Sequence, residues 1–406
     1  MARIKRNPEA IADRVATRPQ RIWRSSPAPV LVAGGIAAWP GNSPPLQSAE
    51  VYDPVLQRFT PTSGPMTSPR SGHSAIGFWQ ISANRFGSVV VLAGGTQDAS
   101  GSGWSAKTDV FEGGTFTAAG DLQEARNGAL FGQVLGGPIA LIGGMATTGA
   151  LASTEILTWA QGNNRFSLAA PMSTSRVGHT VTQVRAANRS PALLVVGGFT
   201  GDLSSHFAEY SAELYGRDGS SHVSQQPSYT FFYTLGNLNR GRAHHAAALL
   251  ADGKVLVVGG TQNSLINADE THPTAEVYDP AADTFSLTGQ MRYRRIFHTA
   301  TTLPSGKVLI VGGTHDGIHV RGPAELYDPA AGTFSAGPTL NQPRQRHTAT
   351  LLGDGNVLIA GGLGADHAVL ASAEVYVSSN NAFVTVGSMN SPRYGHTATG
   401  IPGTVF

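Results

Sequence analysis

The chain of 406 residues contains no cysteine. Disulfide bonds, thiolate metal sites and cysteine nucleophiles are therefore excluded. Charged residues make up only 13% of the sequence, and no apolar stretch is long enough for a signal peptide or a membrane-spanning helix. The sequence therefore predicts no membrane span; the chain as written would be cytoplasmic, but the sequence does not identify the compartment. Glycine, in contrast, occurs 50 times, which favours many tight turns over helices.

An excess of positive over negative charge occurs only in the N-terminal segment. Residues 1–24 carry seven basic and two acidic side chains, a net charge of +5, which leaves −3 for the remainder of a chain whose total is +2. Residues 1–28 are predicted to form a basic arm, either a solvated tail or a contact for an acidic partner. Residues 29–406 lack the basic excess typical of nucleic-acid-binding domains, so no nucleic-acid partner is expected for them.

A repeat dominates what the sequence does contain. Seven Gly-Gly pairs each follow a short apolar run at spacings of 49 to 62 residues: Gly34-Gly35, Gly94-Gly95, Gly143-Gly144, Gly197-Gly198, Gly259-Gly260, Gly312-Gly313 and Gly361-Gly362. A period of this length indicates one supersecondary unit that is copied along the chain.

Two further marks recur in every unit, in the same order. The first is an acidic residue followed by two apolar ones, and the acids are Glu50, Asp109, Glu155, Glu213, Glu276, Glu325 and Glu374. The second is Met or Leu followed four residues later by an arginine: Arg70, Arg126, Arg176, Arg242, Arg295, Arg344 and Arg393. Six units place a histidine three residues after the arginine: His73, His179, His245, His298, His347 and His396. The remaining unit has Ala129 there.

This pattern resembles the kelch repeat. The resemblance rests on the Gly-Gly pair and on the aromatic residues that follow it in each unit, which include Phe59, Phe116, Phe166, Phe285, Phe334 and Phe383. It covers residues 29–406 and implies an all-β fold, a β-propeller in which each repeat forms one four-stranded blade. Strand-length segments such as His298–Leu303 and Lys307–Val311, joined by a turn with Gly306, support short antiparallel strands independently.

The phase of the repeat predicts how the ring closes. The first unit begins at its second strand near Pro29, and the chain ends with an extra first strand at His396–Ile401. We expect this strand to complete the first blade beside residues 29–35, which removes the open sheet edges. Seven blades in one monomeric domain are therefore predicted.

The order of strands also assigns loops to faces. The loop after each Gly-Gly pair and each Arg-x-x-His segment should share one face, which we call the top face. Twelve of the 13 histidines are expected there. Candidate ligand-binding residues in the loops of this face are His206, Tyr210, His272, His315, His319, Arg321, His367, Trp39 and Trp104.

The repeated charged residues and histidines have two interpretations. A residue kept in nearly every unit belongs first to the scaffold, where buried arginines and acids form ion pairs. The repeated histidines at the channel mouth could instead join arginines in holding a carboxylate or phosphate, with binding that is pH-sensitive between about pH 5 and 8. Residues that break the repeat are the better functional candidates, because loops carry function on a rigid scaffold.

The same loops contain residues that could bind a metal ion, and the sequence excludes some cofactors. His315, Asp316 and His319, joined by His272 or His367 from adjoining blades, have suitable ligand types, but their spacing on a loop fixes no geometry. No metal ligand is therefore assigned and no cofactor is predicted. Among kelch-type enzymes, galactose-oxidase-like proteins need a Cys–Tyr crosslink at copper, which the absence of cysteine excludes. The cysteine-containing iron motif of plant specifier-type propellers is also missing.

The leading interpretation is a propeller that binds a partner protein or a small polar ligand at its top-face loops and channel mouth. No serine-hydrolase elbow, phosphate loop or zinc-protease helix occurs in the sequence. The alternative is an enzyme of the epimerase, lyase or cyclase type that acts on a small polar or sugar-like substrate. Top-face histidines and arginines would then serve as acid–base groups. Among kelch-type enzymes, sialic-acid-epimerase-like propellers are compatible with this sequence, because arginine, histidine and glutamate can serve their acid–base chemistry.

Overall fold

The computed structural model describes residues 27–40, 43–82, 85–98, 103–159, 164–184, 191–201, 207–217, 229–233, 236–263 and 269–402. His206 and nearly all of the predicted N-terminal arm lie outside these residues. Within the described ranges, no helix has both the length and the apolar character needed to cross a membrane.

The apolar run before each Gly-Gly pair forms the second strand of a blade, and both of its faces are buried. Strand β1, for example, reads Val-Leu-Val-Ala, and all four side chains are buried. Because side chains alternate along a strand, Val30 and Val32 pack against the preceding blade while Leu31 and Ala33 pack against the following one. This double burial explains why these runs are continuously apolar rather than alternating.

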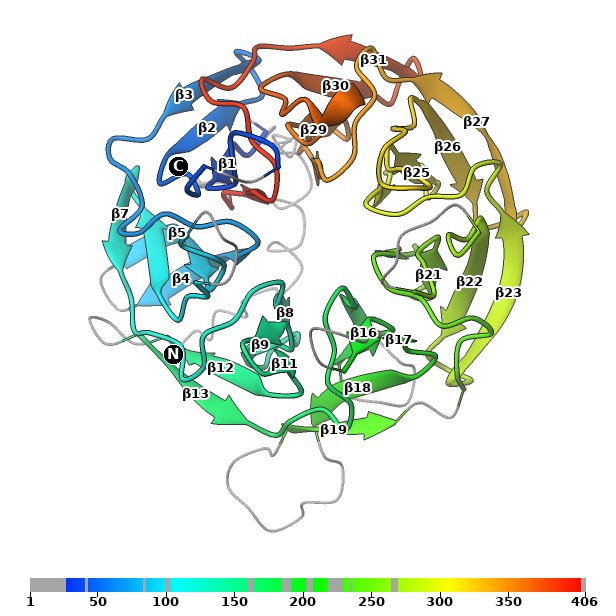
Figure 1. Cartoon of the computed structure of the whole chain (residues 1–406), viewed down its shortest axis with the longest axis horizontal. Coiled ribbons are helices and arrows are strands. Elements are labelled where there is room, and N and C mark those ends of the chain that lie inside the picture. Colours follow the sequence, from blue (N-terminus) through cyan, green and yellow to red (C-terminus); the bar gives the residue numbers. More distant parts are fainter. Residues whose placement is uncertain are drawn as a thin grey trace, which may run out of the picture.

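Seven four-stranded antiparallel sheets are arranged as a seven-bladed ring, as the sequence predicts (Figure 1). From the inner strand outward, the first three blades are β32 (Thr397–Gly400), β1 (Val30–Ala33), β2 (Ala49–Asp53) and β3 (Arg58–Pro61); β4 (Ser74–Ser82), β5 (Arg85–Ala93), β6 (Thr108–Glu112) and β7 (Thr115–Ala118); β8 (Leu130–Gln133), β9 (Ile139–Ile142), β12 (Thr154–Thr158) and β13 (Arg165–Ala169).

The other four blades continue the same order. They are β14 (Thr180–Val184), β15 (Ala192–Val196), β18 (Ala212–Arg217) and β19 (Tyr229–Tyr233); β20 (Ala246–Leu249), β21 (Val255–Val258), β22 (Thr274–Asp279) and β23 (Thr284–Gln290); β24 (Thr299–Thr302), β25 (Val308–Val311), β26 (Pro323–Asp328) and β27 (Thr333–Thr339); β28 (Thr348–Leu351), β29 (Val357–Ala360), β30 (Ala373–Val377) and β31 (Ala382–Thr385). Top-face loops add the ribbons β10 (Met145–Ala146) with β11 (Gly149–Ala150) and β16 (Phe199–Thr200) with β17 (Phe207–Ala208), and the 3-10 turn η3 (Ala365–His367).

The two ends of the repeat region meet in the first blade. Strand β32 pairs with β1, with Val30 opposite Gly400 and Ala33 opposite Thr397. The predicted closing strand is therefore confirmed, and each inner strand contacts the inner strands of both neighbouring blades around the ring.

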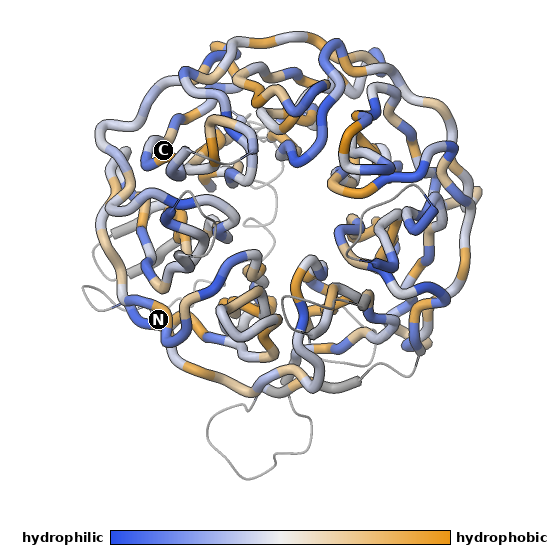
Figure 2. The backbone as a smooth tube through the Cα atoms, in the orientation of Figure 1, coloured by the Kyte–Doolittle hydropathy of each residue, from blue (hydrophilic) through white to orange (hydrophobic). Residues whose placement is uncertain are grey.

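Hydrophobic cores lie between the blades. Seven clusters of buried apolar side chains each draw on two neighbouring blades, so that every blade interface has its own core. Figure 2 shows the corresponding hydrophobic stretches in orange within the blades, with hydrophilic segments between them. Stability is thus distributed over seven interfaces, which leaves the top-face loops free to vary.

Candidate functional site

Each repeated arginine leads into a blade and is buried inside it. In the fifth blade, Nη1 of Arg242 donates to the carbonyl of Gly259 at 2.7 Å, and Nη2 donates to Oε1 of Glu276 at 2.6 Å. Glu276 also accepts the backbone N–H of Asn239 at 2.7 Å. The same pairing recurs in every blade as Arg70–Asp109, Arg126–Glu155, Arg176–Glu213, Arg242–Glu276, Arg295–Glu325, Arg344–Glu374 and Arg393–Glu50. These fourteen side chains hold the scaffold together and leave no free charge for a ligand.

The Gly-Gly pair locks each blade to the next. Gly259 and Gly260 have φ values of 69° and 97°, and the N–H of Gly260 donates to the carbonyl of Arg295 at 2.9 Å. A Cβ atom on Gly259 would lie 2.6 Å from that carbonyl oxygen and 2.6 Å from the ring of His298. Only glycine fits this left-handed, close-packed position, so the blade-to-blade contact explains why the pair recurs in every unit.

The six repeated histidines are buried next to the glycine pairs. Four of them form a hydrogen bond of 2.9 to 3.1 Å from Nε2 to a threonine hydroxyl of the preceding blade: His73 with Thr397, His245 with Thr180, His347 with Thr299 and His396 with Thr348. For His179 and His298, the corresponding residue of the preceding blade is Leu130 or Ala246. The Nε2 atoms of these two histidines have no hydrogen-bond partner among the described residues.

Burial makes these histidines neutral at physiological pH. It lowers the pKa of His179, His298 and His396 to about 3, with the neighbouring repeat arginine as the second cause. Burial likewise holds the pKa values of His73, His245 and His347 well below the usual range. The repeated histidines therefore supply no positive charge near pH 7, and titration between about pH 5 and 8 is not expected of them.

A ring of left-handed residues lies just above these histidines. One residue per unit, at the position before the repeated histidine or Ala129, has a positive φ; we call the set Gly72, Gly128, Gly178, His244, Phe297, Arg346 and Gly395 the mouth ring. Backbone hydrogen bonds of 2.8 to 3.3 Å join five successive pairs, from each N–H to the carbonyl of the preceding member: Gly72 to Gly395, Gly128 to Gly72, His244 to Gly178, Phe297 to His244 and Arg346 to Phe297. Because the inner strands start next to these residues, the mouth ring encircles the axis at the top face.

Three consecutive members of the mouth ring are not glycine. His244, Phe297 and Arg346 have φ values of 53°, 54° and 53°, whereas the other four units use glycine. A left-handed conformation costs an L-residue about 1–2 kcal/mol. Strain of this kind persists where the side chain has a use, so the mouth ring of blades five to seven is the strongest candidate site.

The three side chains contact one another in a row, with the guanidinium of Arg346 over the Phe297 ring and that ring tilted by 45° against the ring of His244. Cζ of Arg346 lies 3.5 Å from the centroid of the Phe297 ring, and that centroid lies 4.5 Å from the centroid of His244. Burial lowers the pKa of Arg346 to about 10, so the guanidinium stays charged at pH 7, while burial and then Arg346 lower the pKa of His244 to about 3. In the described part of the chain, no carboxylate forms an ion pair with Arg346.

Two of the predicted ligand-binding residues meet beside the mouth ring. The rings of Trp39 and His367 stack at 4.7 Å with an angle of 6°, although Trp39 remains 43% exposed. Nε2 of His367 donates to the carbonyl of Gly317 at 3.2 Å, and Trp39 also contacts Tyr394 at 5.6 Å between ring centroids. Top-face loops of blades one, seven and six are thereby connected.

Three other predicted ligand-binding residues lie in the loops of different blades. Tyr210 is 48% exposed, and its hydroxyl accepts a hydrogen bond of 3.3 Å from Gln262. Trp104 forms a backbone bridge with Thr96. His272 is buried with its Nε2 lacking a partner among the described residues, and burial, followed by Arg242, lowers its pKa to about 4.

A second group forms in the loop of the sixth blade. Each of three side chains places one potential metal-ligand atom within 4.8 Å of the others: His315, Asp316 and His319. The guanidinium of Arg321 lies 5.4 Å from the centroid of the Tyr293 ring. The structure does not bring His272 or His367, the expected additional ligands, into this group.

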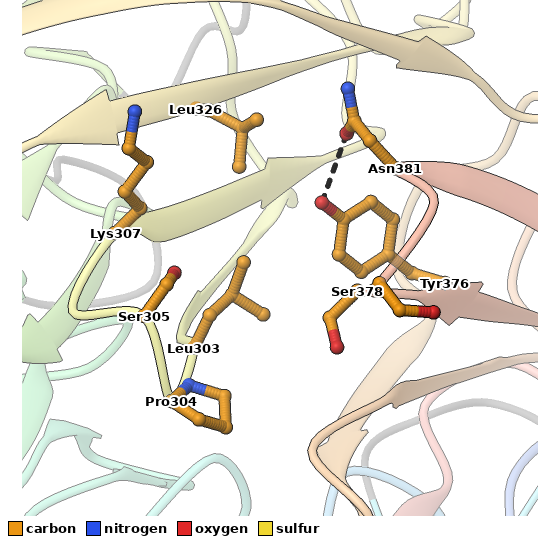
Figure 3. A pocket seen from close by; sticks show the side chains of 9 residues that line it. Leu303, Pro304, Ser305, Lys307, Leu326, Tyr376, Ser378 and Asn381 are labelled. Carbon is orange, nitrogen blue, oxygen red and sulfur yellow. Dashed lines mark hydrogen bonds between the residues drawn. The ribbon is translucent and has the colours of Figure 1, made fainter.

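The opposite face offers a pocket of a different kind. A cavity of 360 Å³ lies between blades six and seven, lined by residues that include Leu303, Leu326 and Tyr376 (Figure 3). Tyr376 donates a hydrogen bond of 2.9 Å to Asn381, and Lys307 is paired with Asp328 at 3.2 Å. Lys307 and the hydroxyl of Tyr376 are therefore already partnered, which makes this pocket a weaker candidate than the mouth ring.

Sequence reasoning missed Phe297 and Arg346. Both lie in the short Arg-x-x-His segment, whose recurrence in nearly every unit favours a role in the scaffold. The available signal was that four units have glycine in this column while three consecutive units have His244, Phe297 and Arg346. The need for a left-handed residue in that column becomes visible only with the backbone geometry.

Comparisons with known proteins support the propeller fold but do not identify a family or a function. No protein-family model matches the chain, and no curated protein sequence matches it. A solved structure titled "Structure of YjhT" matches with a TM-score of 0.54 and 12% identity, covering 79% of this chain and 98% of that chain. Similarity at this identity supports the propeller fold alone, and membership of the kelch family stays a prediction.

Proposed function

We propose that this propeller binds a small anionic ligand, of the carboxylate or phosphate class, at the mouth ring of its top face. The observation that carries the proposal is the replacement of glycine by His244, Phe297 and Arg346 at three adjacent left-handed positions. The scaffold itself needs only glycine there, as Gly72, Gly128, Gly178 and Gly395 demonstrate.

Arg346 is the anion-holding group in this proposal. Its guanidinium is charged although largely buried, and it forms no ion pair within the described ranges. A planar guanidinium can bind a carboxylate or phosphate through two parallel hydrogen bonds. Contact with Phe297 fixes the plane of the guanidinium, which reduces the entropy lost on binding.

His244 supports the ligand as a neutral donor or acceptor rather than as a cation. With a pKa of about 3, its imidazole remains uncharged at pH 7. Arg346 and His244 therefore keep their charge states between about pH 5 and 8, and any pH dependence of binding in that range should come from ionisation of the ligand itself. This differs from the pH-sensitive binding that a charged histidine cluster would produce.

Calorimetric titration of the full chain with inorganic phosphate, acetate and succinate tests the proposal, with glucose as a neutral comparison. We expect saturable binding of at least one anion, weakened at higher ionic strength. Arg346→Gly should weaken that binding by at least about tenfold. Arg240→Ala removes an exposed guanidinium from the same face and should leave the affinity unchanged.

The results also separate the alternatives. Binding that Arg240→Ala weakens as strongly as Arg346→Gly would indicate a diffuse surface charge effect and overturn the proposed site. No heat with any anion would leave a protein partner as the better interpretation of the top face. Chemical change of a bound ligand, followed by proton NMR, would instead support the enzyme interpretation, with His244 as the first acid–base group to substitute.

A further inference from the structure

The loop that follows Gly312-Gly313 brings three metal-binding side chains together. His315, Asp316 and His319 each place a ligand atom within 4.8 Å of the others, and the two imidazole centroids are 5.9 Å apart. Within the described ranges, no other group of three or more His, Asp or Glu side chains meets this condition. Residues of this loop belong to neither the arginine–acid pairs nor the mouth ring.

Hydrogen bonds orient the carboxylate of Asp316 toward the two rings. Its Oδ1 accepts the backbone N–H groups of Ile318 at 3.0 Å and His319 at 2.8 Å, and the hydroxyl of Thr314 at 3.0 Å. Its Oδ2 lies 2.5 Å from Nδ1 of His319 and 3.4 Å from Nε2 of His315. One oxygen therefore anchors the carboxylate while the other remains directed at the imidazoles, as second-shell hydrogen bonds orient metal ligands elsewhere.

Neighbouring blades fix the backbone of the same loop. The hydroxyl of Thr271, from the fifth blade, donates to the carbonyl of His315 at 2.8 Å. From the seventh blade, Gln345 Nε2 and His367 Nε2 donate to the carbonyl of Gly317 at 2.8 and 3.2 Å. A loop held from both sides loses little conformational entropy when a ligand binds.

We propose that His315, Asp316 and His319 form a divalent transition-metal site with open coordination positions. Two imidazoles and one carboxylate suit Zn²⁺, Co²⁺, Ni²⁺ or Cu²⁺ rather than Ca²⁺ or Mg²⁺, which prefer all-oxygen ligand sets. Three protein ligands leave at least one position for water or a substrate atom. His319 is 73% exposed, so the open positions face solvent on the top face.

Local charge moderates the expected affinity. Arg321 and Arg294 lie close enough to act on His315, and their positive charge opposes a divalent ion. The negative charge of Asp316 acts in the opposite direction, and Arg321 is engaged over the ring of Tyr293. We therefore expect a site of moderate affinity that loads when metal is supplied, not one that folding depends on.

The test uses the full untagged chain after chelator treatment, titrated with Zn²⁺ and with Co²⁺. One equivalent should bind, and Co²⁺ should give visible absorption bands of a nitrogen- and oxygen-ligated ion. His315→Ala, Asp316→Asn and His319→Ala should each weaken binding by about tenfold or more. Because His319 is largely exposed, His319→Ala should fold normally, and thermal unfolding without metal verifies this for each variant.

A control substitution lies in the corresponding loop of the seventh blade. Asp366→Asn removes a carboxylate that belongs to the η3 turn and not to the proposed ligand set. It should not change the affinity for Zn²⁺. Failure of the chain to bind either metal, or equal weakening by the control and the three ligand variants, would overturn the site. Cu²⁺ provides a second readout, since its electron paramagnetic resonance spectrum should show two coordinated nitrogens.

Discussion

Arg242 and Glu276 lie 2.6 Å apart, from Nη2 to Oε1, and both side chains are fully buried. Each is bound on its other side to backbone, Arg242 to the carbonyl of Gly259 and Glu276 to the N–H of Asn239. The pair thus ties the segment arriving from the fourth blade to the second and third strands of the fifth. Since all seven blades repeat it, the ring is closed by seven equivalent buried ion pairs.

Removing one partner of this pair should be costly. Glu276→Gln leaves the buried guanidinium of Arg242 without a countercharge, and we expect a loss of about 3–5 kcal/mol in the free energy of unfolding. Arg242→Met should cost a similar amount. The double variant should cost clearly less than the sum, because it leaves no unpaired charge. Urea unfolding of the four proteins measures the coupling, and additive losses would show that the two side chains stabilise the blade independently.

The unpartnered Nε2 of His298 predicts a stabilising substitution. Ala246 occupies the position at which Thr180, Thr299 and Thr348 bind the histidine of the next blade. Ala246→Thr should therefore give His298 a hydrogen-bond partner and raise the free energy of unfolding by about 1 kcal/mol. Ala246→Val adds nearly the same volume without the hydroxyl and should not stabilise. An equal effect of both variants would attribute any gain to packing.

Stability should fall steeply on acidification. The folded-state pKa of His179 is about 3, below its ordinary value of 6.5, so between these values the unfolded chain binds more protons than the native one. The stabilisation that this neutral histidine contributes is fully present above about pH 6.5 and is lost as the pH falls toward 3. Over that range the free energy of unfolding decreases with a slope approaching about 1.4 kcal/mol per pH unit.

His179→Gln isolates this contribution. The variant should lose less stability than the parent between about pH 7 and pH 5, where the unfolded histidine becomes protonated. Val195→Ala lowers stability in the same blade without removing a titrating group, and it should keep the parental pH slope. Urea unfolding at several pH values gives the comparison. Parallel profiles for His179→Gln and the parent would mean that His179 is not the group responsible.

The closing strand predicts what truncation will do. Ending the chain after Tyr394 removes His396 and strand β32, which leaves β1 as an open inner edge and deprives Thr348 of its histidine partner. We expect a large fall in the thermal midpoint together with concentration-dependent association, because an exposed strand edge pairs with other chains. Light scattering detects the association. Ending the chain after Pro402 retains β32 and should leave both properties unchanged.

The fold was predictable because its determinants recur locally. A four-residue apolar run, a Gly-Gly pair and an Arg-x-x-His segment occur in each unit, and the phase of the first and last units specified the pairing of β1 with β32. The histidine–threonine hydrogen bonds between neighbouring blades were also predictable. The donor or acceptor hydroxyl always belongs to the residue that follows the repeated histidine of the preceding unit. At this position the sequence alone distinguishes Thr299 from Ala246.

The candidate site was less accessible from sequence. Trp39 and His367 are far apart in the chain and stack only because the ring closes. The importance of Arg346 depends on its backbone conformation, which its residue type does not predict, since arginine rarely has a positive φ. Assigning loops to one face narrowed the candidates, but which loop residues meet depends on tertiary contacts between neighbouring blades.

Arg346 offers a direct measure of strain that is kept for function. Arg346→Gly relieves the left-handed conformation, worth about 1–2 kcal/mol, and loses the contact with Phe297, worth about 0.5–2 kcal/mol. The free energy of unfolding should therefore stay within about 1 kcal/mol of the parent. Arg346→Ala loses the same contact but keeps the strain, so it should be less stable than Arg346→Gly by about 1 kcal/mol, as urea unfolding can resolve.

Gly395→Ala provides the matched control, because a Cβ atom there would have no neighbour closer than 3.7 Å. Its loss of stability measures the cost of a positive φ in the mouth ring without a steric clash. If Gly395→Ala is destabilising while Arg346→Gly is not, the fold gains nothing from arginine at this position. The side chain of Arg346 must then be explained by what it binds, and the calorimetric titration with anions becomes the decisive measurement. If Arg346→Gly instead costs several kcal/mol, the guanidinium on Phe297 is a scaffold contact, and the anion site loses its main argument.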